Sequence, residues 1–168
     1  MKKIKVDVYN KGKNELPSYS TELSAGFDIR ANLGDKDTKY LGNQKWKVHD
    51  DGHIQLFNGG VILIPTGLHV AVPDGYELQV RARSGLALKN SITVMQGVGT
   101  VDSDYRGEVG VILINHDQSL YFDIHHGDRI GQGILNQVEQ IQWNSVDNIE
   151  HLGETERGQG GFGHTGVK

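Results

Sequence analysis

The segment Glu77-Leu78-Gln79-Val80-Arg81-Ala82 alternates polar and apolar residues without interruption. Such alternation places every second side chain on one face, which is typical of a β-strand with a buried and an exposed side. The same period appears near the N-terminus, where Ile4, Val6 and Val8 share a face. Because no window of a dozen residues carries an apolar stripe of helical period, we expect strands to build the core.

Further apolar runs rich in β-branched residues end at turn-forming residues such as proline, glycine and asparagine. These runs are Val61–Ile64, Leu68–Val72, Val109–Ile114 and Ile130–Val138. About nine short strands are expected in total, which predicts an all-β sandwich or barrel. The best helix candidate spans Ser84–Lys89, with Ser84 as its N-terminal cap.

Composition excludes several classes of protein. The 168 residues carry a formal net charge of −4 and no cysteine, which excludes disulfide scaffolds, thiolate zinc sites and cysteine nucleophiles. The longest apolar run, Val61–Ile64, is far shorter than the roughly 20 residues that span a bilayer. Met1–Asp7 alternates where an export signal would be continuously apolar. We therefore expect a cytoplasmic protein that binds neither membranes nor, being mildly acidic, nucleic acid.

Two stretches depart from the strand pattern. Residues 34–59 are polar and hydrophobically sparse, which suits an inserted excursion or hairpin around Trp46 and Ile54. Residues 151–168 are so rich in glycine that they cannot form a stable element alone. We expect a core over residues 1–150 and a C-terminal arm over residues 151–168.

The arm contains Gly158-Gln159-Gly160-Gly161-Phe162-Gly163, which formally matches the dinucleotide fingerprint G-x-G-x-x-G. That fingerprint needs a preceding strand and a following helix, and only five residues follow Gly163. A Rossmann fold is therefore excluded. The glycines can still bring backbone N–H groups to phosphate oxygens, with Arg157 as a charged clamp and Phe162 stacked on a flat base. A purely solubilising tail is the alternative.

The segment Arg81-Ala82-Arg83-Ser84-Gly85 is a second candidate phosphate contact. Extended backbone places Arg81 and Arg83 on one face, and the first turn of the following helix offers free N–H groups to an anion. An exposed basic face with a serine cap explains the same residues.

Residues Gly97–Glu108 are typical of a hairpin with a turn rich in aspartate and glycine. Asp104 suits a turn-forming role, whereas Asp102 follows apolar Val101, where a carboxylate near phosphate could hold and deprotonate a water. Bare peptide groups at the glycines of the first arm could pair with a flat ligand as an added strand would.

Asp28 and Asp128 each lie between apolar neighbours, and structural ion pairs or turn contacts would explain both.

Taken in order, five segments resemble the five motifs of the homotrimeric dUTP pyrophosphatase (dUTPase) family. They are Ala25–Ile29, Arg83–Ala87, Gly99–Glu108, Gly127–Gln132 and Arg157–Gly166. Departures are small: Ala82, Val101 and Gly131 stand where the family usually has proline, isoleucine and alanine. Gln96 lies where many members have asparagine or glycine. Residues 34–59 make the first half longer than in a typical member.

The resemblance implies a jelly-roll protomer, a homotrimer with active sites at subunit interfaces, and a C-terminal arm that closes over a neighbouring subunit's site. It implies hydrolysis of dUTP to dUMP and pyrophosphate, with Mg²⁺ on the triphosphate and dUMP supplied for thymidylate synthesis. Asp102 would activate the attacking water, and Asp28 would hold a metal-bound water. The substrate-binding residues implied are Arg83, Ser84, Gly85, Gln96, Gly99, Tyr105, Gln132, Arg157, Gly161, Phe162, Gly163, His164 and Thr165.

Two alternatives stay open. A dCTP deaminase-like enzyme of the same fold would need an acid–base residue aimed at C4 of cytosine, and the Arg157–Gly163 run is not expected there. A regulatory protein could instead bind dUTP at this site and contact a protein partner through residues 34–59.

Overall fold

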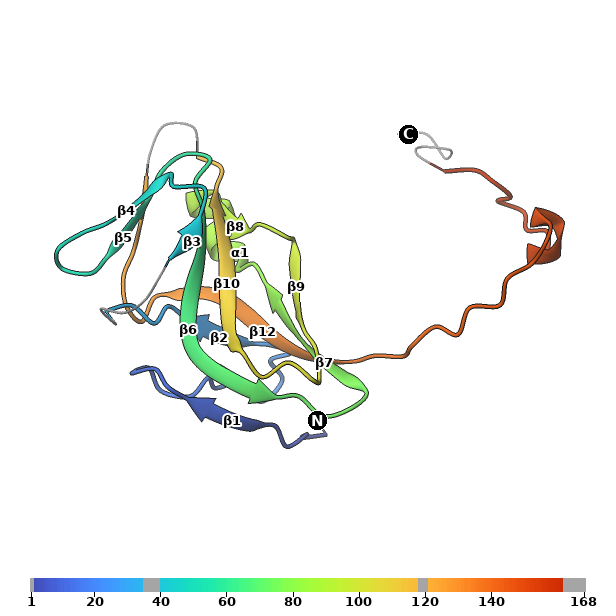
Figure 1. Cartoon of the computed structure of the whole chain (residues 1–168), viewed down its shortest axis with the longest axis horizontal. Coiled ribbons are helices and arrows are strands. Elements are labelled where there is room, and N and C mark those ends of the chain that lie inside the picture. Colours follow the sequence, from blue (N-terminus) through green and yellow to red (C-terminus); the bar gives the residue numbers. More distant parts are fainter. Residues whose placement is uncertain (1, 35–39, 118–120, 162–168) are drawn as a thin grey trace. The chain divides into compact units, whose positions relative to one another are not determined.

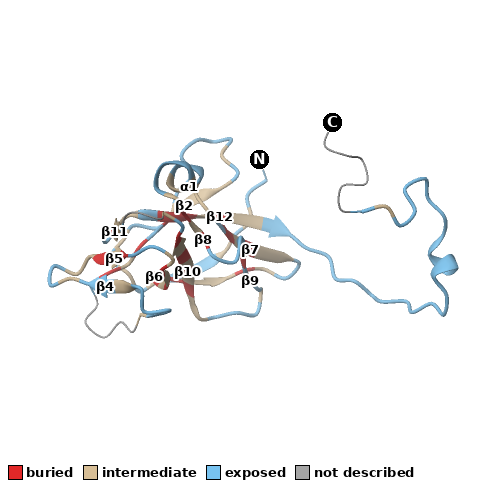
Figure 2. Cartoon of the chain, turned by 90° about the horizontal axis from the view of Figure 1, so that it is seen from above, coloured by how far each residue is buried: buried red, intermediate tan, exposed pale blue. Residues whose placement is uncertain are grey.

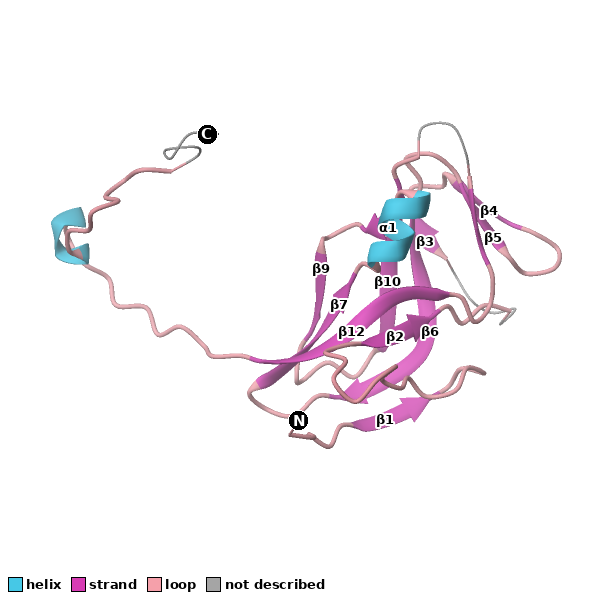
Figure 3. Cartoon of the chain, turned by 180° about the vertical axis from the view of Figure 1, so that it is seen from behind, coloured by secondary structure: helices cyan, strands magenta, loops and turns pink. Residues whose placement is uncertain are grey.

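The computed structural model describes residues 2–34, 40–117 and 121–161. The chain divides into two compact units, Met1–Val138 and Glu139–Lys168. In the described part of the first unit, twelve strands accompany the helix α1 (Ser84–Asn90) (Figures 1 and 3). The all-β expectation is confirmed. The strands outnumber the nine expected because several are only two or three residues long, too short to show a period.

The first sheet is antiparallel and has the order β1-β6-β10-β8, with β3 also paired to β6. Its strands are β1 (Asp7–Asn10), β3 (Leu41–Gly42), β6 (Val61–Ala71), β8 (Ile92–Val94) and β10 (Glu108–Asn115). The long strand β6 lies between β1 and β10 and is the backbone of this sheet.

The second sheet is also antiparallel, with the order β2-β12-β7-β9. Its strands are β2 (Phe27–Arg30), β7 (Tyr76–Arg81), β9 (Val98–Val101) and β12 (Arg129–Gln137). A third, small sheet of order β11-β5-β4 consists of β4 (Trp46–Val48), β5 (Ile54–Leu56) and β11 (Phe122–Ile124). These antiparallel sheets are consistent with the expected jelly-roll-like architecture.

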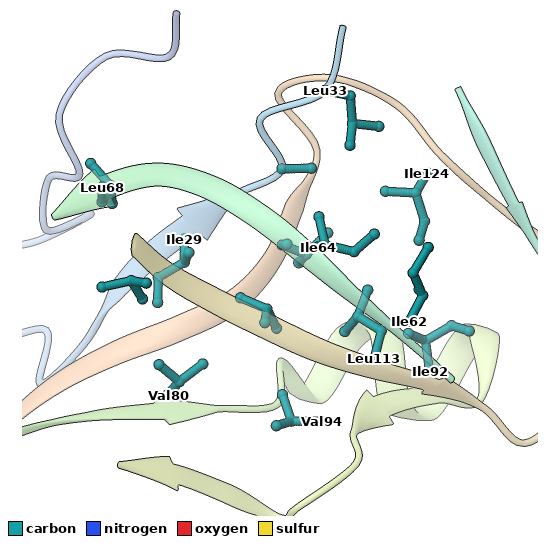
Figure 4. Packing of buried hydrophobic residues seen from close by; sticks show 14 of the residues in the cluster. Ile29, Leu33, Ile62, Ile64, Leu68, Val80, Ile92, Val94, Leu113 and Ile124 are labelled. Atoms are coloured by element: carbon teal, nitrogen blue, oxygen red, sulfur yellow. The ribbon is translucent and has the colours of Figure 1, made fainter. Parts of the chain in front are cut away.

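The core lies between the sheets and draws on all three (Figure 4). Ile29 and Val80 come from the second sheet, Ile64 and Leu113 from the first, and Ile124 from the third. In β10 buried and half-buried residues alternate strictly, which is the period that the sequence predicted for its strands. Figure 2 shows the buried positions concentrated on the strands of the first unit.

The hairpin predicted over Gly97–Glu108 is wrong. Strand β9 pairs with β7 in the second sheet, whereas β10 pairs with β6 and β8 in the first. The two arms therefore join different sheets, and the turn after Asp102 connects them. The cause is packing: Val101 and Val109, at the inner ends of the two arms, are both buried in the core between the sheets.

The helix begins one residue earlier than a cap at Ser84 would require. Arg83 occupies the N-cap position with extended backbone and makes no side-chain capping bond, so Ser84 is the first helical residue rather than the cap. The helix ends at Asn90 and is capped by Ser91, whose backbone is left-handed (φ 54°) and whose N–H donates to the Leu86 carbonyl.

The excursion contains the predicted hairpin, in which Trp46 of β4 pairs with Leu56 of β5. Beside it the His49 and His53 rings stack, with centroids 4.2 Å apart and planes 8° from parallel. His53 Nδ1 lies 2.5 Å from Asp51 Oδ1, and this hydrogen bond lowers the pKa of the Asp51 carboxyl.

The C-terminal unit contains a 3-10 helix, η1 (Ile149–Leu152), whose first turn is capped by the Asn148 side chain accepting from the Glu150 N–H. Its described residues are exposed apart from Gly160. Across the described residues of both units, neither helix has the length and apolar character needed to cross a membrane.

The core assignment predicts a large loss of stability for Leu113→Ala. Leu113 is 1% exposed, so its truncation removes buried methyl groups and leaves a cavity, which costs about 2–5 kcal/mol. The control is Leu88→Ala on α1, where Leu88 is 86% exposed and the cost stays below about 0.5 kcal/mol. Urea unfolding of both variants measures the difference, and equal losses would contradict this core.

Candidate active site

The second sheet aligns three polar residues in one row. Gln132 of β12 is the register partner of Asp28 on β2 and of Arg81 on β7. Directly opposed residues of antiparallel strands point to the same face, so an acid, an amide and a base lie side by side across three strands. Two of them, Asp28 and Gln132, were predicted as site residues.

Asp28 is paired with arginine at both carboxylate oxygens. Arg83 Nε donates to Asp28 Oδ1 at 2.8 Å, and Arg129 Nη1 lies 3.4 Å from Asp28 Oδ2. Arg83 Nη1 also donates to the Arg129 carbonyl at 3.2 Å. Since the Asp28 side chain is 19% exposed and that of Arg83 23%, the pair is largely removed from water. Arg129 is a contact that the sequence patterns did not predict.

Arg81 is held by its own strand. Its Nε donates to Gln79 Oε1 at 2.9 Å, and Gln79 Nε2 donates to Glu77 Oε1 at 2.6 Å. Asn136 Nδ2 also donates to Glu77 Oε1, at 3.1 Å. These bonds, that of Gln79 foremost, lower the pKa of the Glu77 carboxyl. The predicted shared face of Arg81 and Arg83 therefore divides into two polar groups, one around Glu77 and one around Asp28.

A pocket of about 170 Å³ borders the Asp28 group. It is lined by Asp28, Arg30 and Arg129 of the second sheet, by Thr66 and Leu68 of β6, and by residues between Asn14 and Ser20. Ser84 and Gly85, both exposed, follow Arg83 in the first turn of α1. Within the described ranges, no group of three or more acidic or histidine side chains is arranged to hold a metal ion.

Strand β9 forms an edge of the second sheet. Gly99 is the register partner of Val80, and alternate backbone groups of an edge strand point away from the sheet. A Cβ at Gly99 would lie 3.0 Å from Gln96 Nε2, so the Gln96 amide is close to this bare stretch of backbone. In the described part of the chain, the outer side of β9 therefore has no strand partner.

The turn after β9 carries Asp102 and Tyr105, both exposed. The Tyr105 N–H donates to the Asp102 carbonyl at 3.2 Å, and the Tyr105 hydroxyl donates to the Glu108 carbonyl at 3.0 Å. A side chain at Gly107 would collide with the Tyr105 ring. Gly107 is thus required for the tyrosine to fold back over this turn.

The second sheet separates Asp102 from the arginines. Asp102 directly follows Val101, which pairs with Leu78, whereas Arg81 at the far end of β7 pairs with Val98. The position of Asp102 is about four residues from Arg81 along the strand, or about 13 Å at about 3.3 Å per residue. One chain therefore brings together Asp28, Arg83 and Gln132 but not Asp102.

In the C-terminal unit, Arg157 folds onto the glycine-rich run. Arg157 Nε donates to the Gly160 carbonyl at 2.7 Å, and the Gly160 N–H donates back to the Arg157 carbonyl at 3.0 Å. Gly161 is exposed. The remaining predicted residues of the arm, which are Phe162, Gly163, His164 and Thr165, lie outside the described residues.

Comparison with known proteins gives one family. A family model described as dUTPase matches residues 48–166. A deoxyuridine 5'-triphosphate nucleotidohydrolase of Fusobacterium nucleatum subsp. nucleatum is 48% identical over 166 residues, which cover 99% of each chain.

Two solved structures share the fold at lower identity. A dUTPase mutant of Staphylococcus bacteriophage 80alpha with dUpNHpp has a TM-score of 0.77 at 20% identity, covering 97% of this chain and 99% of that chain. A dUTPase mutant from phage phi11 of S. aureus, whose structure concerns the coordination of a structural Mg(II) ion, has a TM-score of 0.68 at 17% identity. That match covers 88% of this chain and 99% of the phage chain.

Proposed function

The chain belongs to the dUTPase family, and from this membership we propose how its residues hydrolyse dUTP to dUMP and pyrophosphate. The observation that carries the proposal is the register of the second sheet, which collects Asp28 and Gln132 at one end and leaves Asp102 at the other. A general base and the phosphate-binding residues must all reach one substrate. We therefore assign each active site to more than one subunit of a homotrimer, so that Asp102 of one chain faces the Asp28 group of another.

Asp102 acts as the general base. Its carboxylate is exposed at the end of a strand, where it can hold a water and accept its proton as the oxygen attacks the α-phosphorus in line. The bond from the α-phosphorus to the bridging oxygen breaks, and pyrophosphate leaves. Fixed donors then stabilise the charge on the phosphate oxygens. These donors are Arg83, Ser84, Gly85, Gln132 and Arg157.

The oxygen chemistry around Asp28 fits Mg²⁺. This ion prefers oxygen ligands and retains several waters, and the Asp28 carboxylate borders a pocket that has room for water. Asp28 would hold the ion through a metal-bound water. When bound, Mg²⁺ neutralises and orients the triphosphate.

In this proposal the edge strand β9 selects the base. Uracil presents N3–H and O4 where cytosine presents a bare N3 and an amino group, so backbone groups around Gly99 and the amide of Gln96 that suit one base leave unpaired atoms with the other. Each such mismatch costs about 1–3 kcal/mol. Tyr105, folded over its turn, lies beneath the deoxyribose and excludes a 2′-hydroxyl.

The C-terminal arm, residues 151–168, completes the site in this proposal. Backbone groups from Gly161 to Thr165, including those of Gly163 and His164, bind phosphate, and Phe162 stacks on the uracil ring. Closure of such a segment excludes water and fixes the substrate. Support comes from the glycine content of the arm and from Arg157, whose guanidinium already lies on the glycine-rich run.

A protein partner on the excursion is a second candidate role. Within this range β4 and β5 form a small sheet with β11, and Leu41, Val48 and Phe57 remain 63%, 40% and 38% exposed. Exposed apolar side chains grouped in one segment suit a protein contact. The dCTP deaminase alternative is not favoured, since the family model that matches is dUTPase. The cytoplasmic location stays a prediction.

Asp102→Asn tests the general base. With Mg²⁺, the unaltered protein should convert dUTP to dUMP and pyrophosphate in preference to dCTP, dTTP and UTP, as product chromatography would show. The variant should bind a non-hydrolysable dUTP analogue normally but turn over about 10²–10⁴-fold more slowly, because an amide cannot accept the proton. Asp104→Asn, in the same turn, is the control and should keep full activity. Near-normal turnover by Asp102→Asn would remove this assignment.

Tyr105→Ala tests sugar selection. Removal of the ring opens space for a 2′-hydroxyl, so the preference for dUTP over UTP should fall by about tenfold, equivalent to about 1.4 kcal/mol. Tyr121→Ala removes a tyrosine that is 53% exposed in another part of the chain and should change nothing. Competition assays between the two nucleotides measure both variants, and unchanged discrimination in Tyr105→Ala would refute the role.

A further inference from the structure

Strand β12 contains an irregularity next to the Asp28 group. Gln132 pairs with Asp28 and Gly131 with Ile29, but Arg129 pairs with Arg30, so Ile130 is an extra residue with no partner on β2. This is a β-bulge, a device that re-aims side chains and is common beside active sites. Ile130 and Gly131 are consecutive buried residues in a strand that otherwise alternates up to Ile134.

The bulge decides where Arg129 points. Arg129 and Gln132 are three residues apart, and in a regular strand they would lie on opposite faces. The extra residue returns Arg129 to the face of Gln132. Arg129 then opposes Arg30, and Arg30 shares a face with Asp28, two residues before it on β2. The Arg129 guanidinium consequently reaches Asp28 Oδ2.

The two oxygens of Asp28 have unequal partners. Oδ1 accepts from Arg83 Nε, and Oδ2 is approached by Arg129 Nη1. In the proposed function, which this inference extends, Arg83 binds substrate phosphate and Asp28 holds a metal-bound water. Arg129 lines the pocket beside Asp28 whereas Arg83 does not, so Arg129 can hold the carboxylate while Arg83 contacts phosphate.

We propose that Arg129 is a positioning residue that, through Oδ2, holds the Asp28 carboxylate in place to bind the metal-bound water. The Asp28 side chain is only 19% exposed, so its charge needs a cationic partner that is not shared with substrate phosphate. The Arg129 side chain is 52% exposed, and phosphate binding is assigned to Arg83 rather than to Arg129. It acts through Asp28 and does not itself touch the reacting atoms.

The test compares binding of dUpNHpp, a non-hydrolysable dUTP analogue, by calorimetry in Mg²⁺ and in EDTA. Arg129→Gln should weaken binding about tenfold in Mg²⁺ and leave it unchanged in EDTA, with partial recovery in Arg129→Lys. Lys47→Gln is the control, because it removes an exposed cation from β4 in the third sheet, outside the Asp28 group. Its affinity should match that of the unaltered protein. An equal loss with and without metal would show a direct phosphate contact and overturn the proposal, as would no loss at all or an equal loss in Lys47→Gln.

Kinetics give a second readout. In Arg129→Gln, kcat/KM should fall about tenfold, and more Mg²⁺ should be needed for half-maximal rate. The double variant Asp28→Asn/Arg129→Gln should be no slower than Asp28→Asn alone, because neighbours that act as a unit are not additive. Additive losses would overturn the inference. Absence of dUTP hydrolysis in the unaltered protein would instead contradict the proposed function itself.

Discussion

The register of the second sheet is the constraint on which the rest of the site depends. Antiparallel pairing of β2, β12 and β7 fixes Asp28, Gln132 and Arg81 in one row, and the pairing of β7 with β9 sends Asp102 to the other end. A slip of one residue would turn every side chain of a strand to the opposite face. The core sets this register, because Ile29 and Val80 of the same strands are buried beneath it.

The ion pairs around Asp28 depend on that register. A carboxylate partly removed from water is costly unless it is paired and hydrogen-bonded, and here two arginines from different strands meet both of its oxygens. Arg83 reaches Asp28 because it stands in extended backbone at the start of α1 rather than inside the helix. The same placement begins the helix and orients the cation that we propose binds phosphate.

Sequence patterns predicted the features that depend on residues close together in the chain. Alternation located the strands, and the polar excursion contains the expected hairpin around Trp46 and Ile54. The hairpin after Gly97 was wrong because both arms match a strand pattern while their partners are distant in sequence. Asp28 and Asp128 look alike in the sequence, yet Asp28 forms ion pairs whereas Asp128 accepts from the His125 N–H in a turn. Arg129 was not predicted because the bulge at Ile130 turns its side chain to the opposite face of the strand. In the sequence, the only local indication of this bulge is the adjacent pair Ile130-Gly131.

The central claim is that each site combines Asp102 of one subunit with the Asp28 group of another. Asp102→Asn and Arg83→Gln chains, each inactive alone, can be unfolded together in equal amounts and refolded into mixed trimers. Random assembly gives intact sites at a frequency of about one quarter, so the mixture should regain about one quarter of the activity of the unaltered protein towards dUTP. If both residues served the same site from one chain, no intact site could form, and a mixture as inactive as its components would contradict the account.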